Sequence, residues 1–435
     1  MTKSSEFTNI ALMRVASAER AKKVSPRAQI SDSSSREDAV SIYARLLHQV
    51  MAGVSTPCEF ILPDGDCHRF GSGPSKFRVV IKSERALRRG FDEFSLGQAY
   101  VEGDIEIEGD MMSLLDLRSQ LEHRRHWPTI IKLWWLLLSR HPIRVNRESI
   151  ADHYNFGDDF YLSFIDKAYR FYSHCNFYSD DETVEQAAEH KLEIMCDALK
   201  LGPGKRLLDI GAGWGAVHEY CGPRGVHVTS VTLTEDSYNY TNGLIRRLGL
   251  SETCEVRRED FLEHRPDELY DGIVIYGVIE HIPYYRRFFQ RVYDCLRPAG
   301  LFYLDASATK QMYDMSDFTR TYIWTGTHSF MCLQELIQEL LFNGLDLLSV
   351  ENDTYSYHLT MRHWATRFDE NRDYIIQRWG AKVYRAFRVY LWGGCHALQN
   401  NMLQAYHLVA QKSNDQGPRP GVIPRTSHFI RHVFR

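Results

Sequence analysis

Apolar residues in the second half of the chain follow two alternating patterns, short continuous runs and longer stretches with a helical period. A continuous apolar run predicts a buried strand at 206–210, and further strands are predicted at 226–233, 253–257, 272–276 and 300–305. The helical stretches between them begin after Gly215 and cover 236–248 and 285–296. Strands and helices that alternate in this way indicate an α/β fold with a doubly wound, mostly parallel sheet. Such sheets bind ligands beyond the carboxyl ends of their strands.

The flanking segments extend this prediction. Apolar residues through 184–199 recur with a helical period, and the helix is expected to end at the glycines and proline of 202–204. Residues 313–400 are largely helical in pattern and rich in aromatic residues, which predicts a helical insertion or cap. Residues 405–411 have a strand-like pattern and are expected to complete the sheet.

A separate, small α+β domain is predicted before the sheet, at residues 37–120. Polar and apolar residues alternate through 58–83 around turn residues at 63–66, which is a hairpin signature. A strand-like, acidic segment follows at 105–110. Residues 1–36 are predicted to form a disordered tail, and residues 121–150 a Trp-rich linker helix. The catalytic domain is expected at 151–412, followed by a carboxy-terminal tail at 413–435.

The linker contains an apolar segment at 127–138, which reads WPTIIKLWWLLL and is bracketed by arginines. A helix needs about 20 apolar residues to span a bilayer, so this segment is too short. Two interpretations remain open. The segment is either a buried helix between domains or a helix in the membrane interface, with Trp at headgroup depth and Arg near anionic lipid.

Composition narrows the class of protein. The 435 residues, 44% of them apolar, are enough for about two or three domains with their own cores. The 52 basic and 56 acidic residues nearly balance, which gives no support for nucleic-acid binding. The nine cysteines include no Cys-x-x-Cys pair, which argues against a disulfide framework or a structural zinc site and fits a reducing cytosol. No metal is predicted.

The strand at 206–210 leads into a glycine-rich turn, with the sequence DIGAGWG at 209–215. The glycines allow a sharp turn close to a ligand, and the next helix offers free N–H groups to an anionic group. A nicotinamide fingerprint needs two residues between its second and third glycines, whereas Trp214 stands alone there. The pattern is instead typical of S-adenosylmethionine (SAM) methyltransferases. It predicts a Rossmann-like sheet of that type with SAM as cofactor.

Polar residues end two other strands at the same edge of the sheet. Thr232, Thr234 and Glu235 stand about twenty residues past the glycines, a spacing that suits contacts with ribose hydroxyls. The alternative is that the acidic residues here cap the next helix. Asp260 follows the third strand, where it either accepts from an adenine amino group or forms a turn.

Two further strands carry groups suited to catalysis. Glu280 and His281 follow the fourth strand and supply a carboxylate and a titratable imidazole at the edge where the reacting end of a ligand is expected. Asp305 ends the fifth strand and adds a second carboxylate. Its alternative role is that of a solvated strand end.

Several further motifs, in the same order, resemble those of the cyclopropane-fatty-acyl-phospholipid synthase family, and the similarity covers most of the chain beyond the tail. Even the segment at 105–110 is similar to the amino-terminal domain of family members. Besides the glycine motif, the similar segments are HYNFGDDFY at 153–161, YSHC at 172–175, VTLT at 231–234, IEH at 279–281, LTMRHW at 359–364 and LQAY at 403–406.

The resemblance implies a SAM-dependent enzyme that modifies the double bond of unsaturated acyl chains in membrane phospholipids, by default to a cyclopropane. It also implies a homodimer in the cytoplasm, peripherally bound to the inner face of the cell membrane. In the family, attack by the alkene creates a carbocation that must be shielded from water and stabilised electrostatically. The base that then removes a proton is thought to be bicarbonate, held by a Cys, a Glu, a His, a Tyr and a backbone amide.

By position, the family Glu is Glu280 and the family Tyr is Tyr357. The Cys is assigned to Cys175 by counting back from 191–192, whereas counting forward from His153 places the family's Tyr-Ser-Cys at 171–173. The predicted catalytic residues are Glu280, His281, Asp305, Tyr357 and Cys175. The predicted SAM-binding residues are Tyr172, Ser173, Asp209, Gly211, Gly213, Gly215, Thr232, Thr234, Glu235 and Asp260.

This chain departs from the family at two positions near the expected base. Asp305 replaces the family His, and Ser307 replaces the Ile two residues later. A carboxylate beside Glu280 repels a further anion. The hypothesis is therefore that bicarbonate binding is lost or remodelled and that Asp305 or His281 acts directly as the base. If the proton is lost elsewhere in the cation, the product is a methylated or methylene-bearing chain and not a ring.

Two other functions stay open on the sequence alone. One is SAM-dependent methylation of a soluble small molecule at nitrogen or carbon. The other is a catalytically inactive protein that binds SAM or lipid.

Overall fold

The computed structural model describes residues 51–83, 93–120, 156–324 and 328–413, together with Val40, Tyr43–Arg45, Leu47, His48 and Ala86. The predicted tails (apart from Ser413) and the Trp-rich linker at 121–150 lie outside the described residues. Within the described part of the chain, no helix is both long and apolar enough to cross a membrane.

The larger of two sheets has seven strands in the order β10-β11-β9-β8-β5-β6-β7. Its strands are β5 (Arg206–Ile210), β6 (His227–Thr232), β7 (Cys254–Arg258), β8 (Tyr270–Tyr276), β9 (Leu296–Ala308), β10 (Leu345–Asn352) and β11 (Gln404–Lys412). The strands from β9 to β7 are parallel neighbours, and β11 runs antiparallel between β9 and β10. The predicted α/β fold with a doubly wound, mostly parallel sheet is confirmed.

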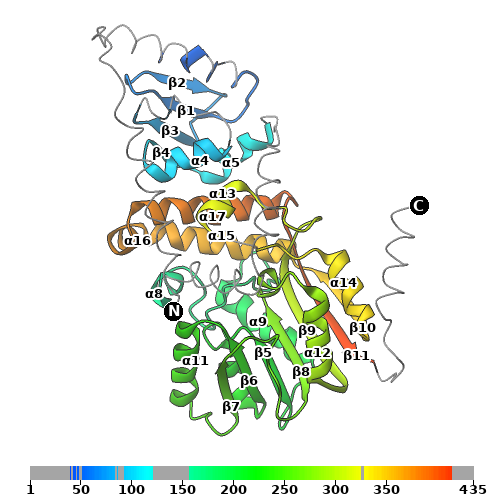
Figure 1. Ribbon diagram of the computed structural model, residues 1–435. Helices are drawn as coiled ribbons and strands as arrows, with labels where there is room; N and C mark the ends of the chain where they lie inside the picture. Colours follow the sequence, from blue (N-terminus) through cyan, green and yellow to red (C-terminus); the bar gives the residue numbers. More distant parts are fainter. Residues whose placement is uncertain are drawn as a thin grey trace, which may run out of the picture.

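Helices cover both faces of this sheet (Figure 1). They are α9 (Val184–Ala198), α10 (Ala216–Cys221), α11 (Glu235–Arg247), α12 (Tyr285–Cys295) and α14 (Leu333–Phe342). The helix predicted at 184–199 begins with a capping box, in which Thr183 and Gln186 satisfy each other's backbone N–H groups. Its apolar side is buried against β5, β8 and β9 in one core cluster.

The segment predicted as a helical cap, 313–400, is interrupted by a strand. Residues 345–352 form β10, because their alternating apolar positions pair with β11 along the whole strand. The strand-like pattern of residues 345–352 is short, and the segments on both sides of it have a helical pattern. The helices of the segment that lie outside the sheet layer are α13 (Asp317–Tyr322), α15 (Thr354–Glu370), α16 (Arg372–Trp379) and α17 (Ala381–Gln399).

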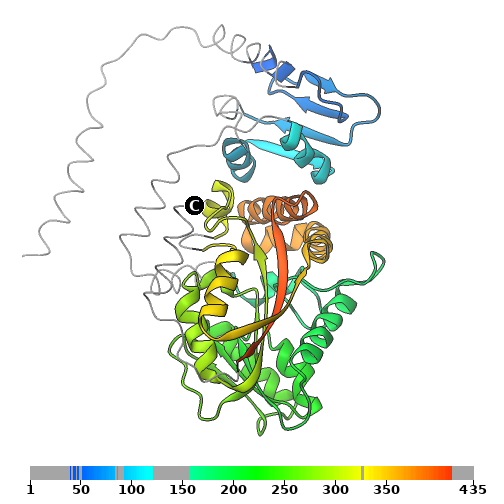
Figure 2. The same cartoon turned by 90° about the vertical axis from the view of Figure 1, so that its right-hand side faces the viewer.

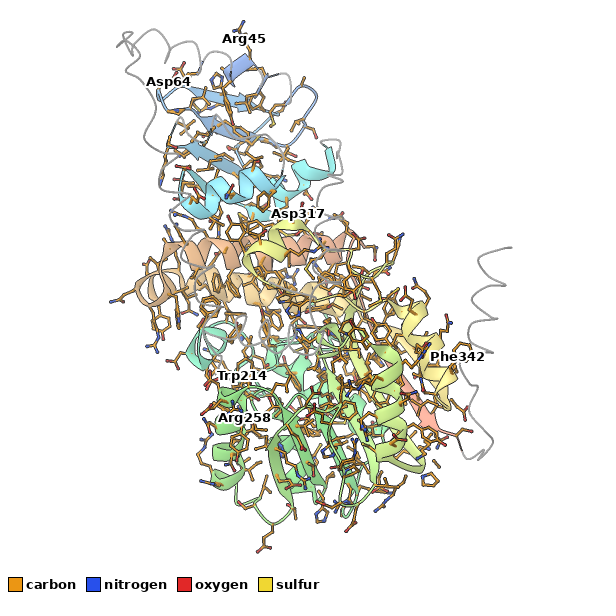
Figure 3. All side chains as sticks on the ribbon, in the orientation of Figure 1. Arg45, Asp64, Trp214, Arg258, Asp317 and Phe342 are labelled. Carbon is orange, nitrogen blue, oxygen red and sulfur yellow. The ribbon has the colours of Figure 1, made fainter. Side chains whose placement is uncertain are left out.

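Helices α15 and α17 form a layer between the large sheet and a small amino-terminal sheet, as the two views agree (Figures 1 and 2). Trp214 lies where this layer meets the glycine-rich turn, and Asp317 lies where it meets the amino-terminal part (Figure 3). An aromatic-rich core that includes Phe160, Trp364 and Phe387 joins the helical layer to the short helix α8 (Asp158–Leu162).

The amino-terminal sheet has the order β2-β1-β3-β4. Its elements are β1 (Cys58–Ile61), β2 (Cys67–Phe70), β3 (Phe77–Ile81), β4 (Ile105–Gly109), α4 (Glu93–Glu102) and α5 (Met111–Gln120). Strands β1 and β2 form the predicted antiparallel hairpin. The sheet is anchored to α17 through an ion pair of 3.0 Å between Arg385 and Glu106 and a hydrogen bond of 3.1 Å from Arg388 to the Tyr100 hydroxyl.

Candidate active site

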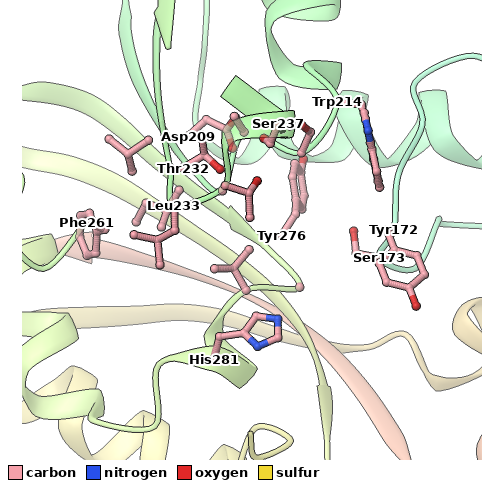
Figure 4. A pocket seen from close by; sticks show the side chains of 18 of the residues that line it. Tyr172, Ser173, Asp209, Trp214, Thr232, Leu233, Ser237, Phe261, Tyr276 and His281 are labelled. Atoms are coloured by element: carbon pink, nitrogen blue, oxygen red, sulfur yellow. Dashed lines mark hydrogen bonds between the residues drawn. The ribbon is translucent and has the colours of Figure 1, made fainter. Parts of the chain in front are cut away.

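A large cavity opens at the carboxyl ends of β5, β6 and β8, beside the glycine-rich turn. Asp209 and Thr232 line one side of it, and Tyr172, Ser173 and Trp214 lie across from them (Figure 4). Helix α10 begins directly after this turn, so its first N–H groups point toward the cavity edge. We call this space the cofactor cavity.

Gly211 keeps this cavity open. Its φ of +96° is a conformation that L side chains rarely adopt, and an added Cβ would lie 2.5 Å from Val278 Cγ2. The turn therefore passes close to the opposite wall without a side chain between them. This is the cradle that a bound nucleoside needs.

Asp209 lies beneath the turn and is almost fully buried. Burial raises the pKa of its carboxyl to about 7, although a hydrogen bond of 2.6 Å from Ser230 Oγ favours the charged form. The Ser230 hydroxyl also lies 2.8 Å from His218 Nε2, and burial lowers the pKa of that imidazole to about 3. The carboxylate of Asp209 thus lines the cavity and is held from behind by hydrogen bonds that run through Ser230 to His218.

Most of the predicted SAM-binding residues line this cavity, and two do not. Thr232, Thr234 and Asp260 line it, as do Gly211 and Gly213, whereas Gly215 and Glu235 are not among its lining residues. Glu235 is corrected because its largely exposed carboxylate binds Arg258 at 2.9 Å on the surface. Gly215 is the N-cap of α10 instead, and an added Cβ there would lie 2.5 Å from Leu244.

Several polar residues outside the predicted SAM-binding set also line the cofactor cavity. Asp236 and Ser237 line it from the start of α11, and the Ser237 hydroxyl donates to the Gly213 carbonyl at 2.7 Å. Asp158 lines it from α8 and accepts from Trp214 Nε1 at 2.8 Å. The similar segment at 153–161 was the signal that pointed to Asp158.

A second, smaller cavity adjoins the first, and Tyr172, Ser173, Gly277 and His281 line both. We call it the inner cavity. Its volume of about 20 Å³ admits about one water molecule. Five aromatic side chains surround it: Tyr172, Trp324, Tyr357, Trp364 and Tyr390.

Two carboxylates line the inner cavity, Glu280 and Asp305. Glu280 is 4% exposed and lies in the short helix η3 (Ile279–His281). Its Oε1 accepts from the Ser307 N–H at 3.0 Å and from Ser307 Oγ at 2.7 Å. Its Oε2 makes no hydrogen bond to any described residue. Burial raises the pKa of Glu280 to about 7, which suits a group that takes up a proton near neutral pH.

Asp305 lines the inner cavity as well, but its carboxylate is ion-paired, which favours Glu280 over Asp305 as the base. Its Oδ2 lies 2.6 Å from Lys191 Nζ, and both side chains are fully buried. Its Oδ1 accepts from the Gly277 N–H at 3.1 Å. The ammonium group balances the charge that the sequence placed beside Glu280, so the expected repulsion is compensated within the fold.

Cys175 is also corrected. It is fully buried in the core under the sheet and lines neither cavity, and its N–H donates to Thr360 Oγ1 at 3.0 Å. Burial raises the pKa of its thiol. Ser173 lines both cavities instead, in agreement with the count forward from His153.

Tyr357 and His281 lie where the sequence placed them, at the inner cavity. The Tyr357 ring packs against His174, with ring centroids 5.2 Å apart. His281 Nδ1 lies 2.6 Å from His328 Nδ1, so one ring nitrogen of the pair donates and the other accepts. The second histidine lies in the segment between α13 and α14.

These residues do not fit bicarbonate as the family holds it. The cavity admits about one water, and the Ser307 backbone N–H is occupied by Glu280 itself. The Cys and His positions carry Ser173 and Asp305. An anion there would face a carboxylate with no added cation, since Lys191 is already paired with Asp305.

Comparisons with known proteins identify the family and the fold of this chain. The sequence model of the mycolic acid cyclopropane synthetase family matches residues 141–408. A sphingolipid C9-methyltransferase of Komagataella phaffii is 27% identical over 349 residues, which cover 75% of this chain and 71% of that protein. A probable fatty acid methyltransferase of Pseudomonas putida is 24% identical over 390 residues, which cover 85% of this chain and 96% of that protein.

Solved structures share the fold. A mycolic acid cyclopropane synthase complexed with S-adenosylhomocysteine (SAH) and CTAB has a TM-score of 0.57 at 24% identity and covers 61% of this chain and 98% of its own. Coclaurine N-methyltransferase, bound to N-methylheliamine and SAH, has a TM-score of 0.59 at 19% identity and covers 73% of this chain and 99% of its own. The chain belongs to the mycolic acid cyclopropane synthetase family and is a SAM-dependent methyltransferase, with SAM as its cofactor.

Proposed function

We propose that this enzyme methylates a carbon of the double bond in an unsaturated acyl chain of a membrane lipid, and that the product keeps an alkene instead of closing a ring. The observation that carries this proposal is the buried Glu280, whose Oε2 has no hydrogen-bond partner among the described residues and faces an aromatic cavity beside the cofactor cavity. The names of the relatives, a sphingolipid methyltransferase and a fatty acid methyltransferase, support a lipid acceptor.

The inner cavity has the features that a carbocation requires. SAM bound in the cofactor cavity would supply an electrophilic methyl group, and four residues that line both cavities would lie between it and the acceptor. The faces of Trp324, Trp364 and the three tyrosines offer negative π density around the carbon that becomes cationic. The same side chains exclude water, which would otherwise trap the cation. Substrate entry requires these side chains to rearrange, because the cavity is small.

Glu280 is the base in this proposal. Its Oε1 is fixed by Ser307, so the carboxylate cannot rotate freely, and its Oε2 is left to accept a proton. Loss of a proton from a carbon next to the cation forms a new double bond and leaves the added methyl as a branch. Loss of a proton from the added methyl itself would instead close a cyclopropane, which is the outcome that the family name favours.

The test is to incubate the enzyme with SAM and vesicles of dioleoyl phosphatidylglycerol, and in parallel with vesicles that contain an unsaturated sphingolipid. Proton NMR of the recovered chains then separates the isomeric products. We expect a branched methyl and a persisting olefin. Ring-proton signals at high field would show that the product is a cyclopropane and would contradict the proposed product. The two vesicle types distinguish a phospholipid from a sphingolipid acceptor.

A soluble amine or small molecule is the competing acceptor. Sedimentation with anionic vesicles distinguishes it from a lipid, because an enzyme that acts on acyl chains must bind the membrane surface at least transiently. An enzyme that stays in the supernatant and turns over neither lipid would contradict the proposed function. Conversion of SAM to SAH in the presence of lipid would exclude an inactive binding protein.

The raised pKa of Glu280 predicts a pH dependence. The base must be ionised, and its pKa is raised to about 7 by burial. We expect kcat/KM for the lipid to fall about tenfold per pH unit below 7 and to level off above about 8. A profile that is flat across pH 7 would contradict Glu280 as the base. Asp209 at the cofactor cavity also has a pKa raised to about 7, so its titration could change cofactor binding over the same pH range. Measuring SAH affinity across this range distinguishes that effect from the titration of Glu280.

A further inference from the structure

Lys191 is a fully buried lysine on the apolar side of α9, and its ammonium group makes two hydrogen bonds and one ion pair directly beneath the site. Its ammonium group lies 2.6 Å from Asp305 Oδ2 and 2.8 Å from Ser173 Oγ. It also donates to the His174 carbonyl at 2.5 Å. A buried charge this far from water is costly unless it is paired with an opposite charge, and Asp305 supplies that charge here.

Two of the residues held by this ion pair form the boundary between the cavities. Ser173 and Gly277 line both the cofactor cavity and the inner cavity. Lys191 holds Ser173 directly, and Asp305 accepts from the Gly277 N–H. Gly277 has a φ of +59°, and an added Cβ there would lie 2.9 Å from Ser173 Cβ. The two backbones therefore meet where the methyl group must pass.

The ion pair also sets the charge around this boundary. Lys191 Nζ lies over the rings of Phe171 and Tyr276, at 4.6 and 4.3 Å from their centroids. The titratable groups that surround the pair are His174, Tyr276, Tyr303, Asp353, His407 and Glu280. Asp353 is itself bound by His174 and by His407, at 3.1 and 2.6 Å. Lys191 is therefore the cation that compensates Asp305.

We propose that Lys191 is a positioning residue for methyl transfer, which, paired with Asp305, holds Ser173 and Gly277 in place as the passage between the cofactor and the acceptor carbon. This inference rests on the proposed function for the acceptor. It does not make Lys191 a proton donor or acceptor. The ammonium acts through Ser173 and the backbone, because it lines neither cavity itself.

The first test replaces Lys191→Met and measures kcat, KM and SAH affinity with the dioleoyl phosphatidylglycerol vesicles. We expect kcat to fall about 100-fold, because misplacing the reacting groups by about 1 Å has an effect of that size. SAH affinity and KM are expected to change less than about fivefold. The matched control is Lys205→Met, which removes a half-exposed lysine from a surface ion pair with Asp271 and should leave kcat unchanged.

The second test is rescue by charge balance. Breaking one side of a buried ion pair leaves an uncompensated charge, whereas removing both sides does not. The double variant K191M/D305N should therefore regain at least about tenfold in kcat over K191M. A double variant that folds but stays as inactive as K191M would overturn the charge argument.

Ser173→Ala keeps the ion pair and removes a single hydroxyl, so it tests the passage even if K191M fails to fold. We expect kcat to fall about tenfold with SAH affinity unchanged. An unchanged kcat, or a loss of SAH affinity that matches the loss of turnover, would contradict positioning. A wild-type enzyme that is inactive on both lipids contradicts the proposed function, whereas an active wild type with an unchanged kcat in K191M contradicts the role of Lys191.

Discussion

Replacing Glu280→Gln is expected to reduce lipid-dependent turnover about 10³-fold while SAH affinity stays within about threefold of wild type. Positioned general bases contribute between about 10² and 10⁴ in rate, and a buried base with one oxygen fixed and one available belongs in that range. Glutamine has the same shape and can still accept from Ser307 through its carbonyl oxygen, so the fold should persist. Single-turnover assays of SAM consumption measure the effect directly.

Glu235→Gln is the matched control, because Glu235 stands at the same edge of the sheet but binds Arg258 on the surface. It should change turnover less than about twofold. Glu280 would be excluded as the base if its variant kept more than about a tenth of the activity. A variant that lost SAH binding together with turnover would show a role in building the cofactor cavity and contradict the role in proton removal.

Gly211→Ala is expected to weaken SAH binding about 100-fold, which corresponds to about 2.7 kcal/mol. The left-handed backbone costs a side chain about 1–2 kcal/mol, and the new Cβ would also meet Val278 at 2.5 Å across the cavity. Both effects act in the folded protein at the place where the nucleoside must lie. Calorimetric titration with SAH measures the loss without any lipid.

The control for this change is Gly249→Ala. Gly249 has a φ of +69°, but an added Cβ would meet nothing within 4 Å, and the residue lies in a turn after α11. It carries the backbone strain without the contact, so SAH affinity should change less than about threefold. Equal losses in both variants would mean that strain alone, and not the wall beside Val278, weakens binding.

Much of the sheet was predictable because its central strands β5 and β8 are rich in apolar residues and because strands and helices alternate along this part of the chain. Strand β10 was not, because it is an edge strand with exposed side chains, lying within a long helical region. Its pairing with β11 depends on contacts between segments far apart in the sequence. Single-sequence periodicity contains no direct information about such a partner.

The site was predictable where a strand end fixed the position of a residue, as for Glu280 and Asp260. It failed where a side chain's partner lay elsewhere in the chain, as for Asp305, whose countercharge comes from α9. One signal was available: Lys191 interrupts an otherwise apolar helix face. A buried lysine needs an anionic partner, so Lys191 predicts that one of the buried carboxylates, such as Asp305, is paired with it.

Helix α17 joins two parts of the molecule that the sequence separates by nearly three hundred residues. Arg385 and Arg388 on one side of this helix bind Glu106 and Tyr100, while Tyr390 on the other lines the inner cavity. A shortened chain that began after the amino-terminal sheet would therefore expose two arginines and an apolar surface of α17, the helix from which Tyr390 lines the inner cavity. The amino-terminal sheet with its helix α4 thus supports a helix that lines the inner cavity.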